Sequence, residues 1–147
     1  MMKKRLFVDM DNCLVDFQSG IDRLTNIDRF RYHGCLDECP RIFSLMDPME
    51  GAIEAYKKLC EEYDVYILST SPWGNPRAAK DKIEWVQRYL PEHAYKRVIL
   101  SHHKNLCVGD YLIDDRTANG AGEFAGEHIH FGTEKFPDWD SVLEYLL

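Results

Sequence analysis

Short apolar runs alternate along this chain with longer stretches in which apolar residues recur at helical spacing. Most of these runs are rich in β-branched or aromatic side chains, and each is too short for a helix, which is typical of buried strands. The predicted strands are Arg5–Val8, Val65–Thr70, Val98–Leu100, Tyr111–Ile113 and His128–Phe131.

Three further stretches have the spacing of amphipathic helices, with apolar residues at steps of three, four and seven. The predicted helices are Gly51–Tyr63, Ala78–Leu90 and Trp139–Leu147. In the second of these we expect Ile83, Val86 and Leu90 on one face, and Pro91 lies just beyond its end.

Because strands and helices alternate, the pattern predicts an α/β fold, with a parallel sheet and helices on both of its faces. Residues 17–46 differ from the rest, because their polarity is mixed and their helical period is weak. We interpret them as an insert over the end of the first strand. The prediction is therefore one domain over residues 1–147, with 17–46 as its insert.

The charge of the chain limits its partners. Its 147 residues are 45% hydrophobic and 29% charged, which is typical of a globular protein. The formal net charge of −7 argues against binding to a nucleic-acid backbone, which needs a basic face. A small anionic substrate stays compatible with this charge, since a few lysines and a cation can reverse the field inside one pocket.

Neither membrane insertion nor secretion is indicated. No apolar run approaches the roughly 18 residues that span a bilayer. Only Leu6–Val8 follow the basic start of the chain, far too few for the core of a signal peptide. The five cysteines form no paired framework, so we expect reduced thiols and a cytoplasmic protein.

Chemically functional side chains gather where the predicted strands end. Ligands of open parallel sheets bind outside the carboxyl ends of the strands. Acidic residues follow the first and fourth strands, hydroxyl residues follow the second, and a lysine follows the third. These residues are Asp9, Asp11, Thr70, Ser71, Lys104, Asp114 and Asp115.

The carboxylates of the first strand end suit a cation site. Asp9 and Asp11 leave extended backbone on the same side, where like charges repel unless something positive lies between them. Mg²⁺ takes oxygen ligands, usually one or two carboxylates plus substrate phosphate. Asp9 and Asp114 supply these carboxylates if their strands are neighbours.

The same residues suit phosphoryl transfer. One aspartate can attack phosphorus, and a second one two residues away can protonate the leaving oxygen and later activate water. Thr70 and Ser71 can donate hydrogen bonds to phosphate oxygens, and Lys104 adds positive charge as the transition state forms.

Four motifs now show a resemblance. DMDNCLVDF, ILSTSP, Lys104 and YLIDDR resemble, in order and spacing, the motifs of the haloacid dehalogenase (HAD) superfamily. Within it, STSP, LIDDR, DPMEGAIEAYKKL and KIEWVQRYL resemble the 5′(3′)-deoxyribonucleotidase family over nearly the whole chain. The resemblance implies a HAD-like Rossmann-type sheet with strand one between strands two and four. It also implies that residues 17–46 form a small helical cap.

The resemblance further implies an activity and its catalytic residues. The activity is Mg²⁺-dependent removal of phosphate from (deoxy)nucleoside monophosphates through an aspartyl-phosphate. Asp9 would be the nucleophile and a metal ligand. Asp11 would be the general acid/base and would offer its backbone carbonyl to the metal. Asp114 would complete the metal site, with Asp115 beside it, acting through water or as an orienting group.

For the substrate, the resemblance implies that Thr70, Ser71 and Lys104 hold the phosphate and that Phe17 packs on the nucleobase. Asn12 departs from the family, which usually has glycine after the second aspartate. Asn tolerates positive φ better than other non-glycine residues, so we expect the loop to be preserved.

Three alternatives remain. The first keeps the phosphatase chemistry but acts on another small phosphate, such as a sugar phosphate. The second is a HAD-like protein that binds without catalysis, although this chain retains both Asp9 and Asp11. The third is a receiver-type signalling domain, in which the acidic pair closes the first strand and not the fourth. The oligomeric state is open, with a homodimer as one possibility.

Other polar residues are given structural interpretations. Lys82 lies on the helix after STSP, and we expect it to be solvated. His128 and His130 are interpreted as the polar face of a strand. Cys13 lies beside carboxylates, which raise the pKa of a thiol and disfavour a nucleophile.

Overall fold

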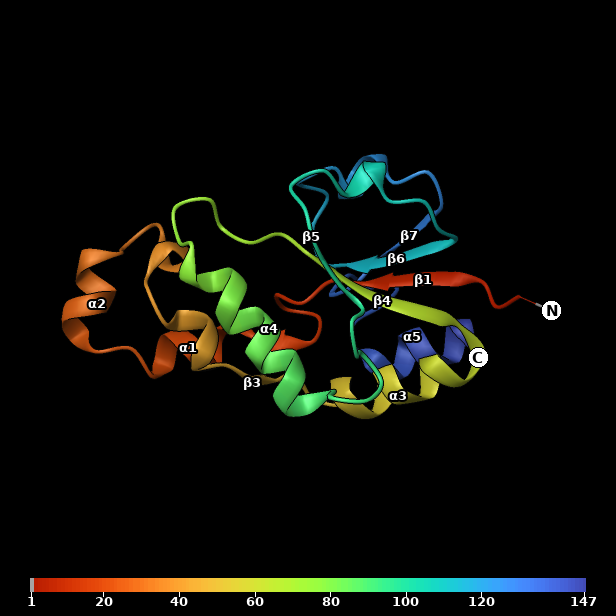
Figure 1. Ribbon diagram of the computed structural model, residues 1–147, viewed down its shortest axis with the longest axis horizontal. Coiled ribbons are helices and arrows are strands. Elements are labelled where there is room, and N and C mark those ends of the chain that lie inside the picture. The colour runs from red at the N-terminus through yellow and green to blue at the C-terminus, as the bar shows by residue number, and fades with distance from the viewer. Residues whose placement is uncertain (1) are drawn as a thin grey trace.

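The computed structural model describes residues 2–147, and its centre is a parallel sheet of five strands (Figure 1). The order across the sheet is β5-β4-β1-β6-β7, and every neighbouring pair is parallel. These strands are β1 (Arg5–Val8), β4 (Asp64–Ser69), β5 (Val98–Leu100), β6 (Tyr111–Asp114) and β7 (Glu127–His130). The order expected from the resemblance is confirmed, with the first strand between the second and the fourth.

Five α-helices and several shorter elements complete the described chain. The three longest helices are α3 (Ala52–Glu62), α4 (Arg77–Tyr89) and α5 (Trp139–Leu146). The remaining elements are β2 (Val15–Asp16), α1 (Phe17–Asp22), α2 (Asn26–Arg31), η1 (Leu36–Glu38), η2 (Ile42–Ser44), β3 (Asp47–Pro48), η3 (Lys104–Leu106) and η4 (Ala121–Glu123), where η marks a 3₁₀ helix. Each predicted strand and helix is present, with bounds within one residue of the prediction.

The sheet is covered on both faces, as predicted, but unequally. On one face, Leu6 and Val8 of β1 belong to a large buried cluster to which α3, α4 and α5 contribute. On the other face, Phe7 packs edge-on against Phe124 in a smaller cluster beside η4. Both faces of β1 are therefore buried, which explains its unbroken apolar sequence.

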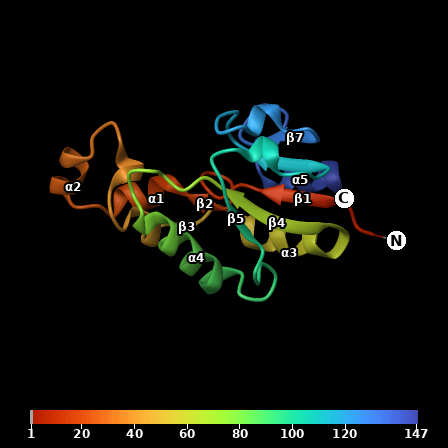
Figure 2. The same cartoon turned by 45° about the horizontal axis from the view of Figure 1, so that its top comes forward.

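The segment 17–46 lies at one end of the molecule, beyond the carboxyl edge of the sheet (Figures 1 and 2). It contains α1, α2, η1 and η2. The buried side-chain amide of Asn75 donates to the carbonyls of Asp37 and Cys39, and the indole of Trp85 donates to the carbonyl of Met46. These three hydrogen bonds join the segment to α4 and to the loop before it.

One residue of a predicted helix face is placed wrongly. Ile83 was expected on the buried face of α4, but 37% of it is exposed. The buried side of α4 includes Ala78, Lys82, Trp85 and Val86. Their spacing of four, seven and eight residues is that of a helix stripe, which contains a lysine. Val86 and Leu90 are buried as expected, so only Ile83 lies off the stripe.

No helix within residues 2–147 combines the length and the apolar character needed to cross a membrane.

Candidate active site

The carboxyl ends of β1, β4 and β6 open onto a cavity of about 690 Å³. The cavity is lined partly by the sheet edge and partly by the segment 17–46. Its lining residues include Asp9, Asp11, Asn12, Phe17, Leu36, Thr70, Trp73, His102, Lys104, Asp114, Asp115, Arg116 and Asn119. All but one of the site residues expected from the sequence therefore lie around one space. The exception is Ser71, which follows Thr70 but does not line this cavity.

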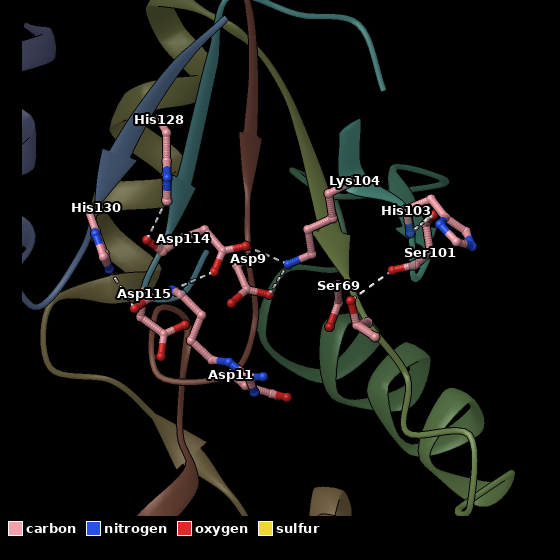
Figure 3. A network of polar contacts seen from close by, with 12 residues as sticks. Asp9, Asp11, Ser69, Ser101, His103, Lys104, Asp114, Asp115, His128 and His130 are labelled. Atoms are coloured by element: carbon pink, nitrogen blue, oxygen red, sulfur yellow. Dashed lines mark hydrogen bonds and ion pairs between the residues drawn. The ribbon is translucent and has the colours of Figure 1, made fainter. Parts of the chain in front are cut away.

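Lys104 joins the two buried aspartates at the carboxyl ends of β1 and β6. Its ammonium lies 2.9 Å from Asp9 Oδ1 and 2.6 Å from Asp114 Oδ2 (Figure 3). Burial alone would lower the pKa of Lys104, but the two carboxylates outweigh it and raise this pKa above its ordinary value. Lys104 is therefore a fixed cation at the floor of the site.

Asp9 is 5% exposed and is surrounded by other charges. Burial raises the pKa of its carboxyl group, and the carboxylate of Asp114 adds to that rise. Lys104 opposes both effects. The ionised form of Asp9 thus depends on positive charge held close to it.

Asp114 and Asp115 are adjacent but differ in their contacts. Asp114 Oδ1 accepts the backbone N–H of Arg116, so both of its carboxylate oxygens have partners. Asp115 Oδ1 is buried without a hydrogen-bond partner. Burial, followed by the charge of Asp9, raises the pKa of Asp115 to about 8. Within residues 2–147, Asp115 is therefore a half-buried carboxylate without a cation beside it.

The loop after β1 turns the first motif across the sheet edge. Asn12 has a φ of 60°, as expected for the position that departs from glycine. Its side-chain oxygen accepts the backbone N–H of Phe17, and the Cys13 carbonyl accepts a hydrogen bond from the indole of Trp139. The loop is thus held by its own side chains and by the last helix.

Lys82 was expected to be solvated, and this prediction is wrong. Lys82 is fully buried, and its ammonium donates to Asp11 Oδ1 at 3.0 Å and to Ser69 Oγ at 2.7 Å. It also lies 4.5 Å from the ring centre of Phe43, a residue of the 17–46 segment. A cation without exposed surface must be paired, so Lys82 belongs to the site.

The pKa of Asp11 depends on its two charged neighbours, Asp9 and Lys82. Its burial and the carboxylate of Asp9 raise the pKa of Asp11, whereas Lys82 lowers it, and the net direction is upward. A carboxyl group that holds its proton more tightly than usual is suited to donate that proton to a leaving oxygen.

Thr70 and Phe17 were both expected to contact the substrate, and both line the cavity. The Thr70 hydroxyl donates to the carbonyl of Ser101 at 2.8 Å, which leaves its oxygen able to accept. Phe17 packs edge-on against Phe43 at 5.8 Å between ring centres.

Cys13 is fully buried, and its pKa lies well above the ordinary value because of burial and the charges of Asp9 and Asp115.

The acidic residues also meet the requirements of a hard divalent cation. One oxygen each of Asp9 and Asp115 and the sulfur of Cys13 lie within 4.8 Å of one another. Asp115 also has one buried carboxylate oxygen, Oδ1, without a hydrogen-bond partner among the described residues. Because Mg²⁺ prefers carboxylate oxygen, the two aspartates fit it better than the protonated thiol does.

Comparison with known sequences connects this geometry to a family. The profile of the 5′ nucleotidase, deoxy (pyrimidine), cytosolic type C protein family matches residues 30–136. The chain belongs to this family. A candidate 5′(3′)-deoxyribonucleotidase of Vibrio phage KVP40 is 62% identical over 144 residues, covering 98% of this chain and 85% of the relative. The 5′(3′)-deoxyribonucleotidase of Bacillus subtilis is 29% identical over 153 residues, which cover 88% of this chain and 86% of the relative.

Solved structures agree on the fold. A candidate HAD hydrolase of Bacillus subtilis, YfnB, whose crystal form was bound to magnesium, gives a TM-score of 0.70 at 11% identity over 99% of both chains. A haloacid dehalogenase-like hydrolase of Streptococcus pneumoniae gives a TM-score of 0.60 at 14% identity, over 97% of this chain and 90% of the other. The fold is therefore HAD-like. The family and its named relatives make the chain a hydrolase of the phosphatase class.

Proposed function

We propose that this protein is a Mg²⁺-dependent phosphomonoesterase that dephosphorylates (deoxy)nucleoside monophosphates through an aspartyl-phosphate on Asp9. The observation that carries the proposal is the approach of Asp9 and Asp115 to within 4.8 Å, beside Lys104 and under a cavity. The family of the chain and the names of its relatives support the nucleotide substrate.

In this proposal Asp9 and Asp115 hold the cation with their carboxylates, and Asp11 offers its backbone carbonyl. This differs from the expectation that Asp114 is the ligand, because Lys104 and the N–H of Arg116 already engage both oxygens of Asp114. Asp114 would instead orient the lysine. When bound, the cation supplies positive charge to the phosphate and keeps the nearby carboxylates ionised.

The first step is attack by a carboxylate oxygen of Asp9 on phosphorus. The new O–P bond forms as the bond between phosphorus and the leaving oxygen breaks, and Asp11 gives its proton to that oxygen. The upward shift in the pKa of Asp11 supports its role as the acid. Lys104, which lines the cavity, would stabilise the charge on the phosphate oxygens, and Lys82 would hold Asp11 in place.

The second step regenerates the enzyme. Asp11, now a carboxylate, takes a proton from water as the water oxygen attacks phosphorus. The O–P bond to Asp9 breaks, and inorganic phosphate leaves. One carboxyl group thus serves as acid and then as base, which returns the site to its starting protonation state.

The cavity has room for a nucleoside monophosphate. Its volume of about 690 Å³ lies inside the usual range for small-molecule sites. Phe17 and Trp73 offer aromatic faces for a base, and Arg116 and Asn119 offer polar contacts. The segment 17–46 would act as the cap.

The five free cysteines support the expected cytoplasmic setting, and a homodimer stays a prediction.

The test is phosphate release from a panel of deoxy- and ribonucleoside 5′- and 3′-monophosphates and of sugar phosphates. Each reaction is run with Mg²⁺ and with EDTA. Asp9→Asn is the inactive variant, and Asp140→Asn, an exposed aspartate on α5, is its matched control. We expect Mg²⁺-dependent release that favours nucleotides, is lost in Asp9→Asn and is retained in Asp140→Asn.

Other outcomes separate the parts of the proposal. Release from sugar phosphates alone would keep the mechanism and reject the nucleotide substrate. Release that survives in Asp9→Asn would reject the aspartyl-phosphate. Release that is unaffected by EDTA would reject the metal requirement.

A further inference from the structure

We propose that His128 and His130 are positioning residues that hold the backbone of the acidic pair so that the Asp115 carboxylate faces Asp9. This inference rests on the proposed metal site but not on any substrate. Both histidines lie on β7, next to the strand that carries Asp114.

The two imidazoles contact two successive backbone carbonyls. His128 Nε2 lies 3.0 Å from the carbonyl oxygen of Asp114, and His130 Nε2 lies 2.9 Å from that of Asp115 (Figure 3). A carbonyl oxygen only accepts hydrogen bonds, so each Nε2 carries the hydrogen. Each histidine therefore acts here as a donor and is not free to bind a cation through Nε2.

Strand geometry explains why two histidines are present. Residues two apart on a strand share a face, so both rings project on the same side of β7. The rings are stacked, with centres 5.1 Å apart and planes 21° from parallel. Each ring limits the rotation of the other, and the pair reaches past the end of β6 to the peptide groups that follow it.

These peptide groups need side-chain hydrogen-bond partners because the backbone pairing of β6 with β7 ends there. The Asp114 carbonyl also accepts the N–H of Phe131, the last ladder-like contact between the strands. Among the described residues, the imidazole of His130 is the hydrogen-bond partner of the Asp115 carbonyl. Removing this donor would leave the peptide after Asp115 free to turn.

The carboxylate of Asp114 is fixed by other contacts, whereas that of Asp115 is not. The Asp114 carboxylate is held by Lys104 and by the N–H of Arg116. The Asp115 carboxylate has a buried oxygen with no partner. The orientation of that carboxylate thus depends on its own backbone, which His130 holds directly and His128 holds one residue earlier. Partners of this kind, behind a metal ligand, govern affinity for the metal.

The test measures metal binding without substrate. Mn²⁺ serves as the probe, followed by electron paramagnetic resonance, in wild type, His130→Leu, His128→Leu and the double variant. His130→Gln keeps an N–H donor at similar reach, and His93→Leu, an exposed histidine outside the site, is the control. We expect the Mn²⁺ dissociation constant to rise about 10-fold or more in the leucine variants. We expect little change in His130→Gln and His93→Leu.

A second measurement uses the unmodified protein. Long-range ¹H–¹⁵N NMR reports which ring nitrogen carries hydrogen, and we expect Nε2–H for both His128 and His130. Thermal unfolding of each variant shows whether it folds; if a leucine variant does not, the glutamine variant and the NMR result decide.

The inference and the proposed function can fail separately. Wild-type Mn²⁺ affinity in folded leucine variants, or Nδ1–H tautomers in the wild type, would overturn the positioning role and leave the phosphatase proposal standing. Weakened Mn²⁺ binding in the leucine variants, with no phosphate released by the wild type, would support the positioning role and reject the proposed activity.

Discussion

Replacing Lys82 by methionine tests whether the buried lysine acts in the reaction or only in the fold. Methionine has a similar length and fills the fully buried site without an ammonium. The change removes hydrogen bonds to Asp11 and Ser69 and the contact with the ring of Phe43. The exposed side-chain fraction of Asp11 is 31%, so its carboxylate can still reach water or take up a proton.

The effect on stability follows from opposing contributions. Hydrogen bonds that involve a charged group contribute about 1.5–3 kcal/mol each, and a desolvated cation–π contact contributes about 2 kcal/mol. Burying the Lys82 ammonium costs several kcal/mol, which the methionine no longer pays, so the net loss of unfolding free energy should be about 2 kcal/mol. The rate should fall far more, by about 10²–10³-fold in kcat, because the proposed acid/base Asp11 loses the cation that holds it.

The assay combines urea unfolding with steady-state kinetics on the best substrate of the panel. Lys80→Met is the matched control, since Lys80 lies on the same helix and forms an exposed pair with Glu84, worth about 0.5 kcal/mol. A stability loss above about 5 kcal/mol would mean that Asp11 behaves as a fully buried, unpaired charge. A kcat within about threefold of wild type would refute the role of Lys82 in the transition state.

Three further predictions concern pH and packing. The metal-free protein should lose thermal stability as the pH rises from about 4 to about 8, because folded Asp115 holds its proton up to about pH 8 whereas its ordinary pKa is 3.8, so the folded state binds more protons over this range. Excess Mg²⁺ or Asp115→Asn should reduce this fall, and a midpoint that rises over the range contradicts it. Gly126→Ala should lower the unfolding free energy in urea by about 1–3 kcal/mol, since its Cβ would lie 2.5 Å from two backbone carbonyl oxygens. Gly34→Ala has open space and should cost about 1 kcal/mol through its positive φ alone, so equal losses would argue against the clash. Trp139→Phe should cost about 1–3 kcal/mol by leaving the Cys13 carbonyl without its 2.8 Å donor, and an unchanged midpoint would show that water replaces the indole.

The strands and most of the site could be predicted because their signals are local. The run Leu6–Val8 is apolar without interruption, as a strand buried on both faces must be. Strand ends of a parallel sheet share one edge, so Asp9, Thr70 and Asp114 were expected together before their distances were known. The left-handed conformation of Asn12 was also expected, from the backbone preference of asparagine.

Lys82 was missed because its partners are distant in the sequence. A lysine on a helix is usually solvated, and only the positions of Asp11 and Phe43 in three dimensions make burial favourable. A signal did exist, since Lys82 stands four residues after Ala78 and three before Trp85, within the stripe that is buried. A charged residue inside an apolar helical stripe is a reason to look for a buried partner.

The differing environments of Asp114 and Asp115 could not be predicted from the sequence. Adjacent aspartates have the same chemistry, and only contacts from Lys104, Arg116 and the histidines of β7 distinguish them. Those contacts join residues of separate loops and strands. The sequence order of the pair carries no information about which carboxylate is left without a partner.

The central place of β1 has a consequence for the synthesis of this protein. β1 pairs with residues 64–67 on one side and residues 111–113 on the other, so it precedes both of its neighbours along the chain. At ribosomal rates of about 5–20 residues per second, β1 emerges roughly 5–20 s before β6 does. During that interval one edge of an apolar strand has no partner, which exposes the nascent chain to aggregation. Chaperone capture of ribosome-bound chains should therefore be strongest before β6 emerges and should fall once it does.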